Sequence, residues 1–165
     1  MSLLVHALSA VLAIAILSPS AAYAQATVAF GGIRADTSLP VEITADQLSV
    51  NQTDGTATFT GSVLIGQGDM RLSAEEVLVV YATGGQSQIE RLHATGGVTL
   101  VSGTEAAEAQ EAIYSIGSGE VVMTGNVLLT QGANTLTGQK LIVDLSTGTG
   151  RMEGRVKTVL QAGDN

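Results

Sequence analysis

Residues 57–68 read Ala-Thr-Phe-Thr-Gly-Ser-Val-Leu-Ile-Gly-Gln-Gly, and residues 121–132 return the same pattern as Val-Val-Met-Thr-Gly-Asn-Val-Leu-Leu-Thr-Gln-Gly. The match continues without gaps from Ala57–Tyr81 onto Val121–Leu145, at an offset of 64 residues. Inside each copy, apolar residues alternate with polar ones, and many of them are β-branched. A period of two with this composition predicts half-buried strands. The chain is therefore predicted to be a β-repeat protein.

Two shorter landmarks extend the repeat beyond these copies. One is Gly-x-Val, which begins at Gly61, Gly96, Gly125 and Gly154. The other is a small residue followed by two polar residues, which begins at Ala45, Ala74, Ala109 and Gly138. The distance from the second landmark to the first is 16, 22, 16 and 16 residues, and the distance back is always 13. The unit is therefore 29 residues long, and the single 22 predicts an enlarged hairpin tip around residues 82–87.

Tight turns are predicted at Asp54-Gly55, Ser118-Gly119 and Thr147-Gly148, because glycine accepts the positive φ of a hairpin tip. Each unit is then two antiparallel strands, and four to five units predict ten to twelve strands in two facing sheets of five or six. No segment shows a convincing helical period. Glu105, Glu108 and Glu111 are spaced by three, and we interpret them as part of a solvated strand edge or loop.

The N-terminus predicts an exported protein. Ala7–Leu17 is a short apolar run, and Ala22-Tyr23-Ala24 is a small-x-small cleavage site, so residues 1–24 are interpreted as a cleaved signal peptide. An uncleaved membrane anchor is the alternative. The expected organisation continues with a flexible segment at 25–38, a β domain at 39–161 and a tail at 162–165.

Composition excludes several classes of function. Seven Lys and Arg against fifteen Asp and Glu give a net charge of −8, which disfavours binding to nucleic acid. Without cysteine there is no thiolate chemistry. His93 is the sole histidine after residue 24 and occupies a repeat position, and the adjacent Glu75 and Glu76 point to opposite faces of a strand. We therefore expect no catalytic residue, no metal site, no cofactor and no enzymatic activity.

A long aliphatic stripe remains to be explained. It is either the core between two packed sheets or the wall of a groove for acyl chains, and the residues alone leave both open. The candidate groove residues are Val41, Ile43, Leu48, Val50, Phe59, Val63, Ile65, Val77, Val79, Val98, Leu100, Val127, Leu129, Leu141 and Val143.

Val41–Leu48, Ala57–Gly68 and Leu72–Val77 together resemble the OstA-like (LptA) family of periplasmic lipopolysaccharide-transport proteins of Gram-negative bacteria. The resemblance covers about Leu39–Leu160 and implies an open β-jellyroll that stacks head to tail. It also implies a groove for the lipid A acyl chains of lipopolysaccharide, with Val41, Ile43, Val98 and Leu100 at matching positions. The implied partners are an inner-membrane export complex, contacted through an LptC-like protein, and an LptD-like outer-membrane translocon.

Open sheet edges are expected to support this assembly by strand addition. The candidate edge residues are Val41, Glu42, Ile43, Thr44, Val156, Lys157, Thr158 and Val159. Alternatively, the segments Gln25–Ser38 and Ala162–Asn165 cover the edges. Three functions stay open: a lipopolysaccharide-bridging protein, a membrane-anchored LptC-like adaptor of the same pathway, and a β-repeat scaffold that polymerises without lipid.

Overall fold

The computed structural model describes residues 27–29, 32–83 and 88–161, and the predicted signal peptide and tail lie outside them. The described residues form eleven strands: β1 (Thr27–Ala29), β2 (Glu42–Thr44), β3 (Gln47–Asn51), β4 (Thr56–Gln67), β5 (Met70–Tyr81), β6 (Ile89–Ser102), β7 (Glu105–Ser115), β8 (Glu120–Gln131), β9 (Asn134–Asp144), β10 (Thr149–Glu153) and β11 (Lys157–Val159). Within these ranges we find no helix long and apolar enough to cross a membrane.

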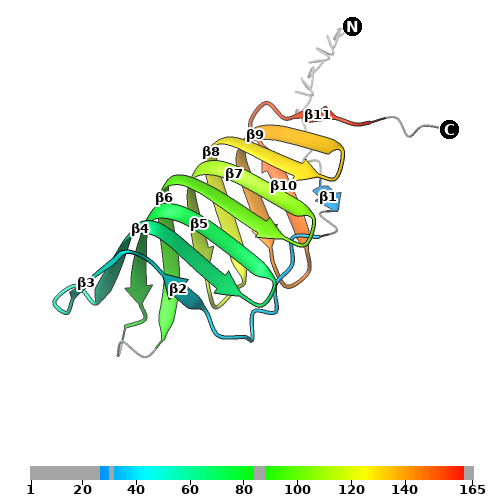
Figure 1. Ribbon diagram of the computed structural model, residues 1–165. Helices are drawn as coiled ribbons and strands as arrows, with labels where there is room; N and C mark the ends of the chain where they lie inside the picture. Colours follow the sequence, from blue (N-terminus) through cyan, green and yellow to red (C-terminus); the bar gives the residue numbers. More distant parts are fainter. Residues whose placement is uncertain (1–26, 30–31, 84–87, 162–165) are drawn as a thin grey trace, which may run out of the picture.

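The strands form one antiparallel meander (Figure 1) in the order β1-β10-β9-β8-β7-β6-β5-β4-β2. β3 pairs the first half of β4, whereas β2 pairs its second half, so β2 and β3 are two parts of one bent strand. β10 and β11 divide β9 in the same way. The all-β repeat of antiparallel hairpins predicted from the sequence is confirmed, and its enlarged tip falls between β5 and β6.

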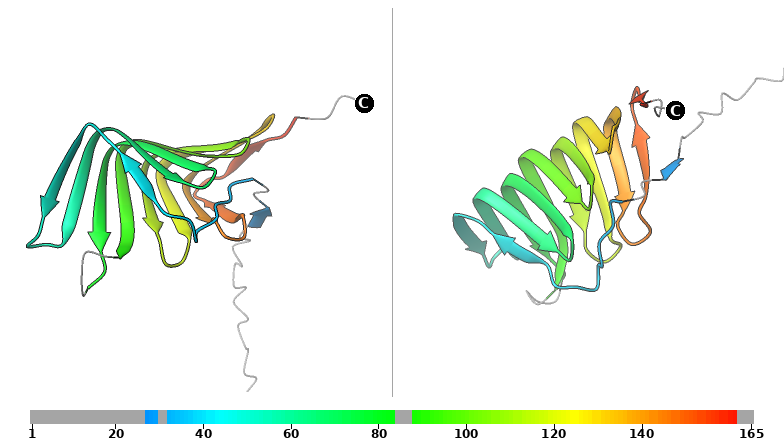
Figure 2. Two further views of the ribbon diagram at one scale, coloured as in Figure 1. Left: turned by 60° about the horizontal axis from the view of Figure 1, so that its bottom comes forward. Right: turned by 45° about the vertical axis from the view of Figure 1, so that its right-hand side comes forward.

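Each long strand bends over a common ridge, which gives the molecule two facing layers (Figure 2). The bends coincide with the Gly-x-Val landmarks: in β4, Gly61 and Ser62 both have positive φ, and the pairing with β5 shifts register between Thr60 and Val63. Such a bulge turns a strand without ending it. We call layer A the layer that holds β2, β11 and the turns at Gly68, Gly103 and Gly132. Layer B holds β3, β10 and the turns at Gly55, Gly119 and Gly148.

The expectation of five or six strands per sheet was therefore wrong. Strands β4–β9 each cross the ridge and contribute one half to layer A and the other half to layer B. Alternation along the sequence cannot distinguish a strand that ends from one that bends at a glycine bulge. Each layer therefore contains more than six strands, and the body is longer along the sheet than two sheets of five or six strands would be.

The two sequence landmarks meet at the ridge. A Cβ atom added to Gly61 would lie 2.9 Å from the Cβ of Asp46, and one added to Gly96 would lie 2.7 Å from the Cβ of Glu75. Gln110 covers Gly125 in the same way, and Gln139 covers Gly154. The two landmarks thus recur together because a polar residue of one packs over the glycine of the other, and this contact is kept between Glu75 and Gly96 despite the six extra residues between them.

This packing predicts unequal effects for two neighbouring glycines of β6. Gly96 and Gly97 have φ of 87° and 88°, but only Gly96 is covered, since no atom lies within 4 Å of a Cβ added to Gly97. Both alanine variants incur left-handed strain of about 1–2 kcal/mol, and Gly96→Ala also collides with Glu75. We expect Gly96→Ala to lower the free energy of unfolding by about 2 kcal/mol more than Gly97→Ala, as measured by urea denaturation. Equal losses would show that Glu75 moves aside.

The core fills the space between the layers. It runs from Ala57 in β4 to Met152 in β10, and its largest buried side chains include Tyr114, Leu100 and Met123. Glu105, Glu108 and Glu111 were interpreted as part of a solvated strand edge or loop; Glu108 is exposed and Glu111 half-buried, but the assignment to an edge was wrong. They lie in β7, which pairs on both sides, and Glu105 faces inward with 8% of its surface exposed. Pairing on both sides makes β7 a central strand, and of the three carboxylates only that of Glu105 lies on its inner face.

Candidate functional site

Fourteen of the fifteen candidate groove residues lie in strands that line the space between the two layers, and Val41 directly precedes β2. Ten of the fifteen belong to its closed part, where each is at most 1% exposed and packs into one continuous core. These ten are Val63, Ile65, Val77, Val79, Val98, Leu100, Val127, Leu129, Leu141 and Val143. The interior is therefore aliphatic along its length, and in this structure protein side chains fill it.

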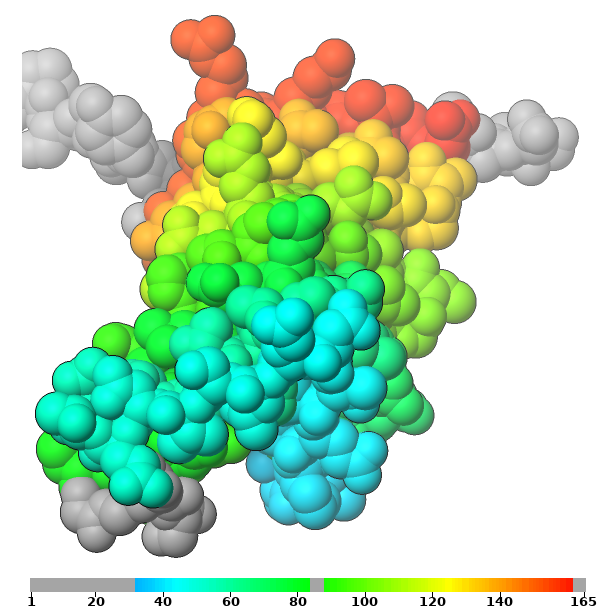
Figure 3. All heavy atoms as spheres, turned by 60° about the vertical axis from the view of Figure 1, so that its left-hand side comes forward, coloured from blue at the N-terminus to red at the C-terminus, as the bar shows by residue number. Residues whose placement is uncertain are grey.

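The other five residues lie where the interior meets solvent. We call them the head mouth: Val41, Ile43, Leu48, Val50 and Phe59. Leu48 pairs with Phe59 and Val50 with Ala57, so both point to the inner face, yet they are 56% and 53% exposed. Figure 3 looks onto this end, where residues of β2 and β3 (cyan) lie on the surface. The apolar interior is thus uncovered at the β2/β3 end.

Both predicted edges are strand edges in the structure. Glu42–Thr44 form β2, which pairs only with β4, and Lys157–Val159 form β11, which pairs only with β9 among the described strands. β1 covers the edge of β10 in layer B and leaves β11 in layer A without such a neighbour. Among the described strands, layer A thus has unpaired edges at β2 and β11, and layer B has unpaired edges at β3 and at β1 itself.

The two edges differ in charge. Near β2 and β3, the carboxylates of Glu42, Asp46 and Asp54 are exposed and outnumber the exposed Arg71. At the opposite end, Arg155 and Lys157 are exposed, whereas the nearby Arg151 is paired with Glu153 at 2.7 Å. We call the β2/β3 end the head edge and the β11 end the tail edge. An acidic head edge and a basic tail edge favour head-to-tail contact between copies over head-to-head contact.

A segment that lies mostly within residues 25–38, predicted to be flexible or alternatively to cover the sheet edges, crosses the remaining opening on the side opposite the ridge. We call residues 32–40 the strap. Ile33 is completely buried in the core, and the Ala35 N–H donates to the Leu145 carbonyl at 3.1 Å. Gln67 Nε2 donates to the carbonyls of Thr37 and Leu39, at 3.2 and 2.9 Å. The strap therefore contacts both layers.

Inward-facing polar groups lie near the turns of layer A. Tyr114, from layer B, donates its hydroxyl to Gln67 Oε1 and so joins the two layers across the interior. Burial raises the pKa of the Tyr114 hydroxyl, so it stays protonated and able to donate near neutral pH. Gln131 Nε2 donates to the buried Glu105 carboxylate at 3.1 Å. The sequence signal for these inward-facing polar groups was that both repeat copies carry glutamine at the equivalent positions 67 and 131.

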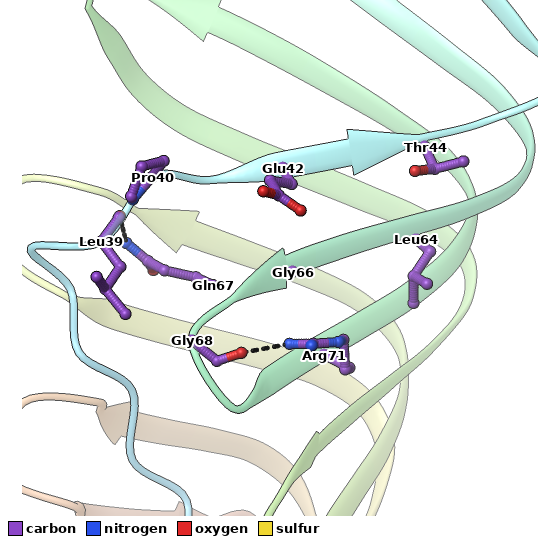
Figure 4. Close-up of a pocket in the computed structure, with 9 residues that line it drawn as sticks. All are labelled: Leu39, Pro40, Glu42, Thr44, Leu64, Gly66, Gln67, Gly68 and Arg71. Atoms are coloured by element: carbon purple, nitrogen blue, oxygen red, sulfur yellow. Dashed lines mark hydrogen bonds between the residues drawn. The ribbon is translucent and has the colours of Figure 1, made fainter.

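Outside the layers, a surface hollow of about 270 Å³ adjoins the head edge (Figure 4). Leu39, Pro40 and outward-facing residues of β2 and β4 line it. Arg71 lies at its rim, where the guanidinium donates to the carbonyls of Gly68 and Met70. The hollow is partly polar and lies outside the apolar interior.

His93 lies away from the interior and is partly exposed. Its Nε2 contacts the Glu111 carboxylate of the neighbouring strand, which makes it one half of a surface pair. Across the described ranges, no three His, Asp or Glu side chains converge as metal ligands would.

The geometry defines an open, two-layered β-jellyroll with a continuous apolar interior. A sequence profile described as LptA/(LptD N-terminal domain) LPS transport protein matches residues 42–149. An uncharacterised protein of Rhizobium meliloti (strain 1021) is 33% identical over 72% of this chain and 69% of its own length. The lipopolysaccharide export system protein LptA of Escherichia coli (strain K12) is 29% identical over 57% of this chain. The match spans about half of that protein's length, 54%.

The fold is similar to that of a solved structure as well. LptH of Pseudomonas aeruginosa, described as the LptA-homologous periplasmic component of the lipopolysaccharide transport device, superimposes with a TM-score of 0.68. The superposition covers 78% of this chain and 99% of LptH at 19% identity. The chain belongs to the LptA/LptD N-terminal-domain family of lipopolysaccharide transport proteins.

Proposed function

We propose that the protein is a periplasmic carrier that holds the acyl chains of lipid A between its two layers. One observation carries this proposal: the aliphatic interior continues to the head mouth, where Leu48 and Val50 face inward and are more than half exposed. Exposed aliphatic side chains that prolong a core are expected where an apolar partner binds. The family membership identifies lipopolysaccharide as the partner to test.

The size of the hydrophobic effect suits a carrier. Each CH₂ removed from water contributes about 0.8 kcal/mol. A twelve-carbon chain that is half buried would gain on the order of 5 kcal/mol before the cost of ordering it. This holds a lipid without trapping it, which a protein that passes its ligand onward requires.

The shape of the body supports transfer along several copies. Eight strands about 4.8 Å apart make a layer roughly 40 Å long, too short for one copy to bridge two membranes. The unpaired edges β2 and β11 permit strand addition in layer A at either end. We therefore propose head-to-tail self-assembly in which the interiors of successive copies are continuous.

The same edges are proposed to contact the neighbouring components of the pathway. An LptC-like protein of the inner-membrane export complex and an LptD-like translocon would each add to one edge. Cleavage after Ala24 would release the mature chain into the periplasm, where both partners are accessible.

The test compares ligands that differ only in their acyl chains. Residues 25–165 should bind purified lipopolysaccharide in a co-purification or fluorescence assay. They should bind its deacylated, sugar-only form at least tenfold more weakly, because the interior offers apolar walls. Equal binding of both would overturn the groove. Binding of neither by a folded protein would favour a strand-pairing scaffold without a lipid ligand.

A further inference from the structure

The strap lies along the one side of the body that the ridge leaves open. Its neighbours alternate between the two rows of turns: Ser102 of layer A contacts Arg34, Leu145 of layer B contacts Ala35, and Gln67 of layer A contacts Thr37 and Leu39. In Figure 2 this blue-to-cyan segment follows the free ends of the hairpins from β1 to β2. The strap therefore spans the gap between the layers.

The attachment of the strap differs from that of a strand. It adds no ladder to either sheet, and its fully buried apolar anchor is Ile33. Most of its remaining hydrogen bonds join its backbone to side chains: Ser102 Oγ donates to the Arg34 carbonyl at 2.6 Å and accepts from the Arg34 N–H at 3.3 Å. Residues 34, 36 and 38–40 are exposed. Such a segment can detach while every strand pairing of the sheet stays intact.

Detachment would change the chemistry of the opening. Ile33 would leave the core, and Gln67 Nε2 and Ser102 Oγ would lose their partners on the strap. With the strap attached, Gln67 and Ser102 are at most 2% exposed. Once the strap has detached, both side chains would face the opening. An amide N–H and a hydroxyl are suitable donors for ester and amide carbonyls, the groups that join acyl chains to a sugar head. The strap backbone occupies these donors with its own carbonyls.

We propose that residues 32–40 form a displaceable lid over the acyl-binding interior, and that Gln67 and Ser102 bind the carbonyl groups of the lipid once the lid has moved. This inference rests on the proposed lipid-carrying function and specifies how lipid reaches the interior from the side. In the closed form the strap keeps the interior dry and blocks acyl chains, and lipid binding and strap attachment exclude each other.

A reversible crosslink tests the lid. A Cβ atom added to Gly119 would lie 4.0 Å from the Cβ of Thr37, within the range of a disulfide. The chain contains no cysteine, so Thr37→Cys/Gly119→Cys forms a single possible pair in the full-length protein. We expect the oxidised variant to capture lipopolysaccharide at least tenfold more slowly than the same sample after reduction. The reduced form is the matched control, because the strain of a side chain at Gly119 is present in both.

The outcomes separate the lid from the carrier function. If oxidised and reduced forms capture lipid at the same rate as the natural chain, the lid is overturned and the carrier stands. If the natural chain captures none, the carrier function fails and the lid with it. If the double variant does not fold, Ile33→Ala takes its place: a weakened anchor should speed capture at least threefold. An unchanged rate in that folded variant would overturn the lid.

Discussion

Replacing Leu48 by aspartate is expected to weaken capture of acylated lipopolysaccharide at least tenfold while leaving the β-sheet circular dichroism spectrum unchanged. Leu48 is 56% exposed in the absence of ligand, so the substitution removes little packing from the fold. An acyl chain at the head mouth would have to desolvate the new carboxylate, which costs several kcal/mol when no partner compensates it. The measurement is the lipopolysaccharide binding assay described above.

Ser49→Asp is the matched control, because Ser49 is the exposed neighbour on the opposite face of β3. It introduces the same charge into the same strand and should leave capture unchanged. Equal effects of the two variants would contradict the proposed binding face and indicate a general repulsion of the lipid phosphates. Val63 is a poorer site for this test, since it is 1% exposed and an aspartate there would destabilise the core.

The second large effect is expected at the tail edge. Arg155→Glu/Lys157→Glu should raise the dissociation constant of the head-to-tail assembly about thirtyfold, or about 2 kcal/mol, because two attractions of up to ~1 kcal/mol each become repulsions. Arg155 and Lys157 are exposed and lie at or beside β11, whereas the head edge carries Glu42 and Asp46. Sedimentation velocity over a range of concentrations gives the constant.

A compensating variant distinguishes complementarity from damage to the edge. Adding Glu42→Lys/Asp46→Lys to the tail variant restores opposite signs at the two ends and should recover most of the lost affinity. Raising the salt concentration should weaken the natural assembly and strengthen that of the tail variant, because ions screen exposed charges in both. Absence of rescue, together with an assembly insensitive to salt, would show that the charges do not guide it.

Much of the fold was predictable from periodicity. Alternation with a period of two identified the strands, and the glycines at positions 55, 119 and 148 identified three turns, each with a φ between 61° and 69° in the structure. The Gly-x-Val landmark was recognised without its role, because a bulge that bends a strand does not interrupt the alternation. Its partner landmark was recognised too, but only the folded ridge brings Asp46 against Gly61 and Glu75 against Gly96.

The candidate site was predictable in part. The aliphatic stripe identified the inner face, yet it could not distinguish Val63, which is buried, from Leu48, which is exposed, because both have apolar neighbours at alternate positions. Burial depends on whether another layer covers the residue. The strap carries no periodic pattern, and its single anchor, Ile33, resembles any isolated apolar residue in a loop.

Local chemistry therefore determined the all-β class, the 29-residue unit, the turns and the acidic net charge, since these depend on backbone preferences and on the residues themselves. The tertiary structure decided which stretch of the stripe is open, which edges stay unpaired, and what crosses the gap between the layers. Those properties depend on contacts between residues far apart in the chain: Tyr114 with Gln67, and the strap with the turns at positions 102 and 145. The period and the composition describe neighbours along the chain. They contain no information about such contacts, which form only once the strands bend and the two layers face each other.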